Sequence, residues 1–272
     1  NHRIIIDAEA SSGSFADVVR AGYGSRVLDD LVAPLVGGVY STDPYGVTLD
    51  ELAPDLAARV ASGTPLREAV TQRVRTAPPG GAVHGIRGGM NALVELVVTS
   101  ARAASGAFEL SCGEPVTGLE RDGVRWRVTT TARTLTAPIV VLALPVDAAA
   151  RLLGAASVPQ TTRIEVITLV LDAPGMRGDE PRGTGVLVGA DVPGVTAKAL
   201  THSTAKWAWL REAAEGRDYV RLSYGRRGQA PASAVLDESD LRRLVTADAA
   251  ALLGRPVPEP IEVRRTGWAI LP

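Results

Sequence analysis

The apolar residues of the first 76 positions recur at helical spacing and are separated by capping sequences. Ser14 and Thr48 each begin a capping-box pattern, in which a hydroxyl accepts an N–H of the first helical turn. From Ser25 onward the apolar residues fall three and four apart, which predicts a helix with one buried face. That face comprises Val27, Leu28, Leu31, Val32 and Leu35. The series ends at residues 78–81, two prolines and two glycines, so we predict several short helices followed by a break.

After this break the pattern predicts a helix, a hairpin and further strands. A helix is expected from residue 90 to about 104, with a buried face of Met90, Leu93, Val94 and Val97. Strands are expected at 108–111, 116–120 and 124–130. Asp122-Gly123 signals a hairpin between the last two. Six consecutive apolar residues at 139–144 are typical of a strand covered on both faces, and a helix is expected over 146–153.

The last third alternates strands with one long helix. Strand patterns occupy 164–171, 195–201, 219–224 and 261–268. A helix is predicted over 237–253, because Asp237 can cap its start and Gly254 can end it. The order of elements predicts an α+β fold in which a helical subdomain is joined to a mixed or antiparallel sheet.

Composition and charge narrow the classes of function. The chain has 272 residues, 46% of them hydrophobic, and can fill a substantial core. Its formal net charge is −1, so no excess positive field is available to bind nucleic acid. No stretch approaches the roughly 18 uninterrupted apolar residues of a membrane span. Cys112 is the only cysteine of this sequence, and we expect it to be a small buried apolar residue.

Familiar catalytic motifs do not occur in this sequence. The three histidines, His2, His84 and His202, lack the spacing of metal ligands, so no metal site is expected. No G-x-S-x-G sequence is found, which argues against a hydrolase. The glycines at 37–38 and 183–185 match neither a dinucleotide fingerprint nor a P-loop. They indicate turns or close approaches of the backbone.

Six segments, in this order, resemble those of the protoporphyrinogen and coproporphyrinogen oxidases, FAD-dependent members of the flavin amine oxidase superfamily. They are residues 31–44, 88–93, 115–128, 141–153, 203–207 and 268–272. The segment 139–153 is shared across the superfamily, so the discriminating segments are 37–44 and 203–207. The chain departs from the family at residues 41–43, which are Ser-Thr-Asp where Ala-Gly-Asp is usual.

The resemblance implies a division of the chain into three regions. Residues 14–85 would form a helical part facing the substrate or a membrane, 86–150 would belong to the FAD-binding domain, and 151–272 would form the substrate-binding sheet. The N-terminal Rossmann segment of the family, with the G-x-G-x-x-G turn that holds the pyrophosphate, is absent from this sequence. We therefore expect the middle portion of such an enzyme, which alone retains no FAD and is inactive.

In the full-length enzyme implied by the resemblance, hydride passes from coproporphyrinogen III or protoporphyrinogen IX to FAD, giving the porphyrin of haem biosynthesis in an oxygen-dependent reaction. The cofactor carries that chemistry, so the catalytic residues are left unassigned. Gly38, Leu187 and Trp207 would line an apolar slot for the macrocycle. Ordinary core packing is the alternative role for each of them.

The remaining predicted site residues concern charge and cofactor. Lys206 and Arg87 are candidate cations for the substrate propionates, with a solvated surface charge as the alternative. By the resemblance, Val116 would offer backbone hydrogen bonds to adenine and Trp268 would lie near the flavin, with core packing as the alternative for both. A tetrapyrrole is the expected partner, and a homodimer or a transient contact with the next haem-pathway enzyme is compatible with the resemblance. We expect a cytoplasmic location, with or without peripheral membrane contact.

Two other functions remain open from the sequence. The superfamily-level segments also suit another flavin amine oxidase-like enzyme, acting on an amine or a polyene. A flavin-free module that binds tetrapyrroles or a partner protein would need no nucleotide motif. The segment 37–44 and the pair Lys206-Trp207 favour the porphyrinogen oxidases over the first of these.

Overall fold

The chain forms two compact units. The computed structural model describes residues 13–76, 84–104, 106–157, 161–173, 176, 183–189, 192–226 and 228–270. The first unit comprises residues 1–83, 162–268 and 272, and the second comprises 84–161 and 269–271. The second unit is therefore inserted, in sequence, into the first.

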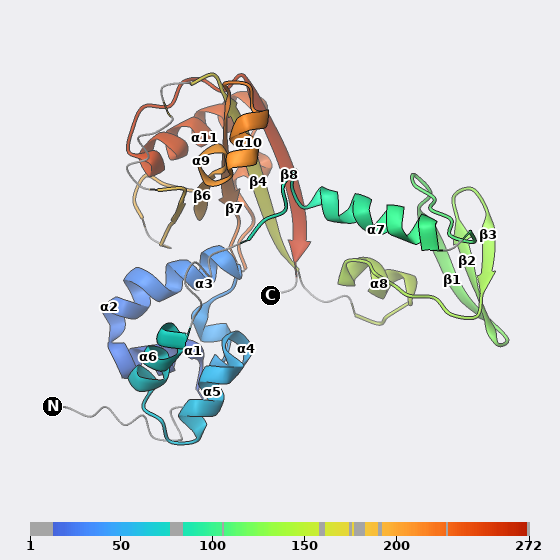
Figure 1. The fold of residues 1–272 in the computed structure, drawn as a ribbon, viewed down its shortest axis with the longest axis horizontal. Coiled ribbons are helices and arrows are strands. Elements are labelled where there is room, and N and C mark those ends of the chain that lie inside the picture. Colours follow the sequence, from blue (N-terminus) through green and yellow to red (C-terminus); the bar gives the residue numbers. More distant parts are fainter. Residues whose placement is uncertain are drawn as a thin grey trace. The chain divides into compact units, whose positions relative to one another are not determined.

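Short helices make up the N-terminal part of the first unit (Figure 1). They are α1 (Phe15–Tyr23), α2 (Ser25–Val27), a π-helical turn (Leu28–Val32), α3 (Ala33–Val39), a 3-10 turn (Pro44–Gly46), α4 (Leu49–Leu52), α5 (Pro54–Ala61) and α6 (Leu66–Thr76). The predicted caps are confirmed, since Ser14 Oγ accepts from the N–H of Asp17 and Thr48 forms a capping box with Glu51. Val18, Leu49, Leu56, Val60, Leu66 and Ala69 form the larger of the two small cores of these helices.

The predicted buried face beginning at Ser25 is only partly right. Leu28 is buried, but Leu31 and Leu35 are 66% and 50% exposed. The physical reason is the π-helical turn at Leu28–Val32, which inserts an additional residue into the helical spiral. The residues after it are therefore rotated away from the face that a regular 3.6-residue period predicts.

A five-stranded sheet with the order β5-β6-β7-β4-β8 forms the rest of the first unit. Its strands are β4 (Thr162–Leu171), β5 (Gly185–Leu187), β6 (Ala199–His202), β7 (Asp218–Tyr224) and β8 (Glu262–Ile270). The pairs β5/β6, β6/β7 and β7/β4 are antiparallel. Strand β5 was not expected. The strand expected at 195–201 begins only at Ala199, because the N–H groups of Thr196 and Ala197 bond to the Asp248 carboxylate.

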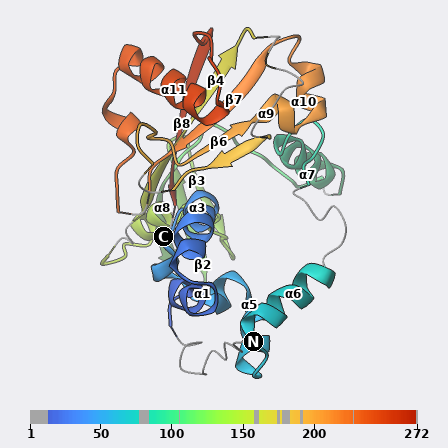
Figure 2. The same cartoon turned by 90° about the vertical axis from the view of Figure 1, so that its left-hand side faces the viewer.

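Helix α11 (Glu238–Leu253) packs along this sheet, as Figures 1 and 2 show from two directions. Its buried Val245 and Ala249 join Leu222 and Ile167 of the strands in one apolar core. The helix is bounded as predicted, because Asp237 accepts from the N–H of Asp240 and Gly254 adopts the left-handed conformation with φ 68°. The short helices α9 (Ser203–Lys206) and α10 (Ala208–Ala213) follow β6, and a 3-10 turn covers Ala232–Val235.

The second unit contains two helices and a three-stranded antiparallel sheet. Its elements are α7 (Asn91–Ala104), β1 (Val116–Asp122), β2 (Arg125–Thr130), β3 (Thr134–Ala137) and α8 (Val146–Leu152). The predicted hairpin is confirmed, with Gly123 at φ 58° in its turn.

Three predictions for the second unit are wrong. Residues 108–111 and 139–144 are not strands, and Ile139 and Val141 are 77% and 83% exposed. A strand needs a neighbouring ladder, and no described strand of this unit pairs with either segment. The predicted buried face of α7 is also exposed, because its apolar period specifies a helix but supplies no partner to cover it.

The α+β prediction is confirmed by this architecture. None of the described helices has both the length and the apolar content needed to cross a bilayer.

Candidate functional site

Gly38 and Leu187, two of the predicted slot residues, are in contact in the first unit. Gly38 lies in the last turn of α3, and Leu187 ends the edge strand β5. A Cβ atom at Gly38 would lie 2.5 Å from Cδ2 of Leu187, well inside the ~3.5–4.0 Å at which carbon atoms pack. A Cβ atom at Gly38 would therefore fit only if the side chain of Leu187 shifted.

Exposed apolar side chains surround Gly38 along the chain. Between 50% and 66% of the surface of each is exposed, and they are Leu31, Leu35, Val39 and Tyr40. Leu187 is itself 40% exposed. We call these five residues the apolar strip. Neighbouring apolar groups that remain exposed are typical of a binding surface.

Trp207 and Lys206 form a second pair within the first unit. Trp207 joins α9 to α10 and is half-buried. The exposed Lys206 places Nζ 5.4 Å from the centroid of the Trp207 ring, a cation–π contact. Trp268 lies on β8 and is 46% exposed. Among the described residues, the structure thus joins Gly38 to Leu187 and Lys206 to Trp207, and we assign no contact between these two pairs.

A buried lysine beside the Gly38 contact was missed by the sequence analysis. Lys198 is 1% exposed, and its Nζ donates to Oγ of Ser41 at 2.5 Å. Ser41 has the left-handed φ of 55°, which is unusual for a residue other than glycine and often marks a functional site. Burial, followed by the charge of Arg226, lowers the pKa of Lys198 to about 8.

Arg226 fixes the end of β5 next to this lysine. Its Nη2 donates to the carbonyl oxygens of Val188 and Gly189 at 3.1 and 3.0 Å. A hollow of about 190 Å³ lies here, lined by Ala33, Gly37, Ser41, Thr42, Asp43, Arg226 and Gln229. Nothing in the sequence pattern distinguishes Arg226 from the many other arginines, so only the fold could reveal this cluster.

Another polar cluster of the first unit is buried away from solvent. Nε2 of His202 lies 3.3 Å from Oδ1 of Asp218, and Thr204 donates to the same oxygen at 2.6 Å. The side chains of His202 and Asp218 are 2% and 0% exposed. The cluster therefore anchors the start of α9 on β7 and is not accessible to a substrate. Among the described residues no three His, Cys, Asp or Glu side chains are grouped as metal ligands.

In the second unit, Val116 borders a hollow of about 300 Å³. Val128 and Leu135 provide further apolar lining, and the polar lining consists of Glu109, Ser111, Glu114, Thr130 and Arg133. A hydrogen bond from Thr130, followed by one from Arg133, lowers the pKa of Glu114. Arg133 pairs with Glu109 and Glu114 at 2.6 and 3.0 Å, so the polar lining of this hollow is an ion-paired cluster. Cys112 lies in the preceding segment. It is exposed, so the expectation that it is buried is wrong.

Arg87 also belongs to the second unit and is exposed before the start of α7. Arg87 and Val116 lie in the second unit, whereas the predicted slot residues lie in the first.

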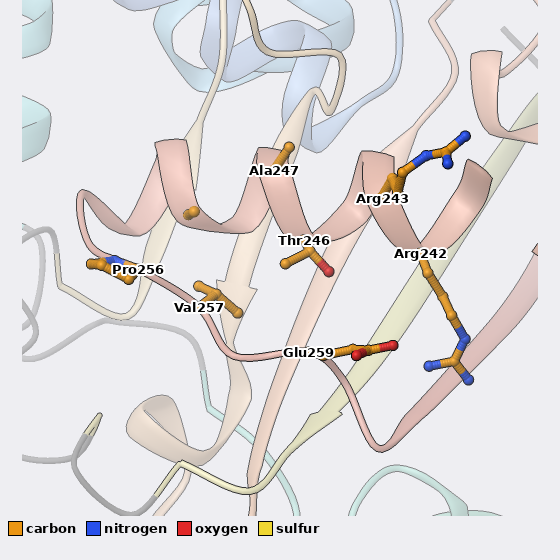
Figure 3. Close-up of a pocket in the computed structure, with 8 residues that line it drawn as sticks. Arg242, Arg243, Thr246, Ala247, Pro256, Val257 and Glu259 are labelled. Carbon is orange, nitrogen blue, oxygen red and sulfur yellow. The ribbon is translucent and has the colours of Figure 1, made fainter. Parts of the chain in front are cut away.

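A further hollow, of about 500 Å³, lies between α11 and the segment that follows it (Figure 3). Arg242 and Arg243 extend in different directions in this view, and none of the predicted site residues lines the hollow. Arg242 donates to the carbonyl of Pro260 and to Glu238, and Arg243 pairs with Asp240. These guanidinium groups do not converge on one point, so the hollow is a poor candidate for a catalytic site.

Comparison with known proteins establishes the family. Residues 7–272 match the sequence model of the flavin-containing amine oxidoreductases, and the chain belongs to this family. The coproporphyrinogen III oxidase of Mycobacterium leprae (strain TN) is 31% identical to it over 265 residues, covering 95% of this chain and 56% of that protein. The chain thus spans just over half the length of the curated relatives that it matches. The resemblance deduced from the sequence is confirmed.

Solved structures show the same fold. A structure from Exiguobacterium sp. 255-15, provisionally assigned as a protoporphyrinogen oxidase, gives a TM-score of 0.76 at 20% identity over 94% of this chain and 55% of that one. A putrescine oxidase bound to putrescine gives 0.60 at 14% identity over 97% of this chain and 55% of that one. At these identities the likeness concerns the fold alone.

Proposed function

We propose that the chain is the substrate-binding part of an FAD-dependent oxidase that converts coproporphyrinogen III or protoporphyrinogen IX to the porphyrin. The similarity to a coproporphyrinogen III oxidase supports this proposal. The observation that carries it is the contact between Gly38 and Leu187 beside the apolar strip. Gly38 belongs to the segment that most distinguishes porphyrinogen oxidases from other members of the superfamily.

In this proposal the chain binds and orients a flat apolar ring. Because Gly38 has no Cβ, no side chain projects beside Leu187 at this position. The apolar strip would cover one face of the macrocycle and remove it from water. Trp207 offers a half-buried aromatic ring for stacking. Holding the substrate in one orientation and excluding water are the contributions that these residues make to the reaction rate.

Two of the predicted residues concern the family cofactor. Val116 and the hollow beside it would take the adenine end, and the exposed Trp268 would lie near the flavin ring. When bound, the flavin supplies the hydride acceptor. No acid or base of this chain is assigned to the reaction.

Titration with coproporphyrin III, the stable oxidised ring, tests this function. In a variant with Trp126, Trp209 and Trp268 replaced by phenylalanine, Trp207 is the remaining tryptophan and reports on the slot. We expect saturable quenching of its fluorescence by coproporphyrin III and none by putrescine. Saturable binding of putrescine with no binding of the porphyrin would instead indicate an amine oxidase.

A pair of matched variants locates the binding surface. Leu187→Asp places a charge beside Gly38 and is expected to weaken coproporphyrin binding at least tenfold, because the charge must be desolvated under an apolar ring. Val235→Asp, at a position 88% exposed in the same unit, is expected to change nothing. Equal affinities for the two variants would contradict the proposed slot.

A further inference from the structure

Two cations converge on the small hollow that adjoins Gly37 and Gly38. Lys198 lies behind Ser41, and Arg226 lines the hollow directly. Its volume of about 190 Å³ equals the space of roughly six water molecules. The hollow is therefore large enough for a small polar group with a short aliphatic arm.

Lys198 and Ser41 have N–H and O–H donors for which the described residues provide no acceptor. An ammonium has three N–H groups, yet Ser41 Oγ is the one acceptor that Lys198 has among the described residues. Ser41 in turn has a hydroxyl hydrogen to donate, and no described residue accepts it. A buried donor without an acceptor is unfavourable, and a charged donor is more so. An acceptor is thus the group that would complete this cluster.

The balance of charge indicates an anionic acceptor. The positive charges of Lys198 and Arg226 act on each other across the cluster. Asp43 also lines the hollow and offsets part of this positive charge, while its Oδ1 accepts from the N–H of Tyr45 at 2.8 Å and caps the 3-10 turn that follows. A negative group between the two cations would be attracted by both.

We propose that Arg226, Ser41 and Lys198 form a subsite that binds a carboxylate. Arg226 contributes its positive charge at the hollow while its Nη2 holds the carbonyls of Val188 and Gly189, the hydroxyl of Ser41 donates a hydrogen bond to the carboxylate, and Lys198 fixes that hydroxyl while adding its charge. The subsite adjoins the slot, since Nη1 of Arg226 lies 3.6 Å from the position of a Cβ at Gly37. Arg226 also binds the carbonyl of Val188, the residue after Leu187.

The identity of the natural ligand rests on the proposed function. In that function the carboxylate is a propionate of the tetrapyrrole, whose ring lies on the apolar strip while its side chain enters the hollow. The sequence-based candidates Lys206 and Arg87 are exposed, whereas Lys198 is buried and Arg226 is half-buried.

Sodium propionate is the probe for the subsite itself. Amide NMR signals of Gly37, Ser41 and Gly189 are expected to shift saturably, with a Kd of about 1–10 mM, and not to do so with sodium chloride at equal ionic strength or with propionamide. Lys198→Met and Arg226→Met are expected to weaken binding at least tenfold. Arg26→Met, a control whose side chain is 96% exposed, should bind like the unchanged protein.

A second pair of variants tests the subsite without removing either cation. Ser41→Ala removes a donor and should weaken propionate binding, whereas Asp43→Asn keeps the cap, removes a negative charge and should strengthen it several-fold. No saturable difference between propionate and chloride, or full affinity in Lys198→Met, overturns the subsite.

Coproporphyrin III and its tetramethyl ester separate this inference from the proposed function. We expect the acid to bind at least tenfold more tightly than the ester in the unchanged protein and equally in Lys198→Met. If coproporphyrin binds with unchanged affinity to Lys198→Met, the propionate assignment fails while the proposed function stands. If propionate binds through Lys198 but coproporphyrin does not bind at all, the proposed function fails and the carboxylate subsite stands.

Discussion

At the scale of single residues, the close approach of Gly38 to Leu187 determines how α3 meets the sheet. The absence of one methyl group allows a helix and an edge strand from distant parts of the chain to touch. Gly37, one position earlier, faces no such restriction, because a Cβ there would lie 3.6 Å from its nearest neighbour, an ordinary contact. The two adjacent glycines therefore have different roles.

Gly38→Ala is expected to have a free energy of unfolding about 1 kcal/mol lower than that of Gly37→Ala, because the added methyl displaces the end of the Leu187 side chain. Urea denaturation measures this change. Gly37→Ala is the control and should be neutral or stabilising by up to about 1 kcal/mol. Adding Leu187→Ala to Gly38→Ala should recover part of the loss, and strict additivity of the two changes would show that they do not interact.

The buried Lys198 makes stability depend on pH. Its pKa is lowered from 10.5 to about 8 in the folded state, so between these values the unfolded chain binds more protons and stability rises with pH. The stability advantage of Lys198→Met over the unchanged protein should therefore shrink between pH 8 and 10. Ser41, Arg226 and Asp43 are the polar groups beside it in both proteins. A difference independent of pH, in denaturation at pH 7, 8, 9 and 10, would contradict this account.

At the scale of elements, one carboxylate links α11 to the sheet. Asp248 accepts from the backbone of Thr196 and Ala197 and from the hydroxyl of Tyr224 at 3.0 Å. Burial, followed by the charge of Asp248, raises the pKa of Tyr224, so this hydroxyl remains a donor at neutral pH. The same contacts explain why the strand expected from residue 195 begins later.

Asp248→Ala is expected to cost about 3 kcal/mol of stability, because two buried donors and one partly buried donor lose their acceptor. Glu238→Ala changes an acid that is 80% exposed on the same helix and should cost less than about 0.5 kcal/mol. Thermal or urea denaturation compares the two. Similar costs would mean that Asp248 is not a structural acceptor.

The sequence predicted those elements that depend on local signals. The caps at Ser14, Thr48 and Asp237 and the hairpin at Gly123 are correct, because each depends on residues close together in the chain. The strand at 139–144 and the buried face of α7 are wrong, because both require partners that a local pattern does not specify. In the candidate site, resemblance provided Gly38 and Leu187. Lys198 and Arg226 became visible only when the fold brought them together.

At the scale of the whole molecule, the residues of the proposed slot all belong to the first unit. The second unit carries Arg87 and Val116 and interrupts the first between residues 83 and 162. Each unit has its own sheet, and the proposed sites for the macrocycle and for the adenine end lie in different units.

Replacing residues 84–161 by a flexible Gly/Ser linker of roughly a dozen residues should leave a first unit that folds and binds coproporphyrin III within about threefold of the unchanged affinity. The physical reason is that the apolar strip, Trp207 and the carboxylate subsite are retained. Circular dichroism checks the folding and fluorescence titration the binding. A folded unit without affinity would place essential contacts in the second unit.

The π-helical turn before α3 has a consequence for natural variation in this segment. Each residue of a helix corresponds to a rotation of about 100°, so deleting one residue within 28–32 would turn α3 by that angle. The buried Val36 would take the exposed place of Leu35, and Val39 would replace Gly38 opposite Leu187. The number of residues in this turn, more than their identity, therefore sets the rotation of α3 about its axis relative to the sheet.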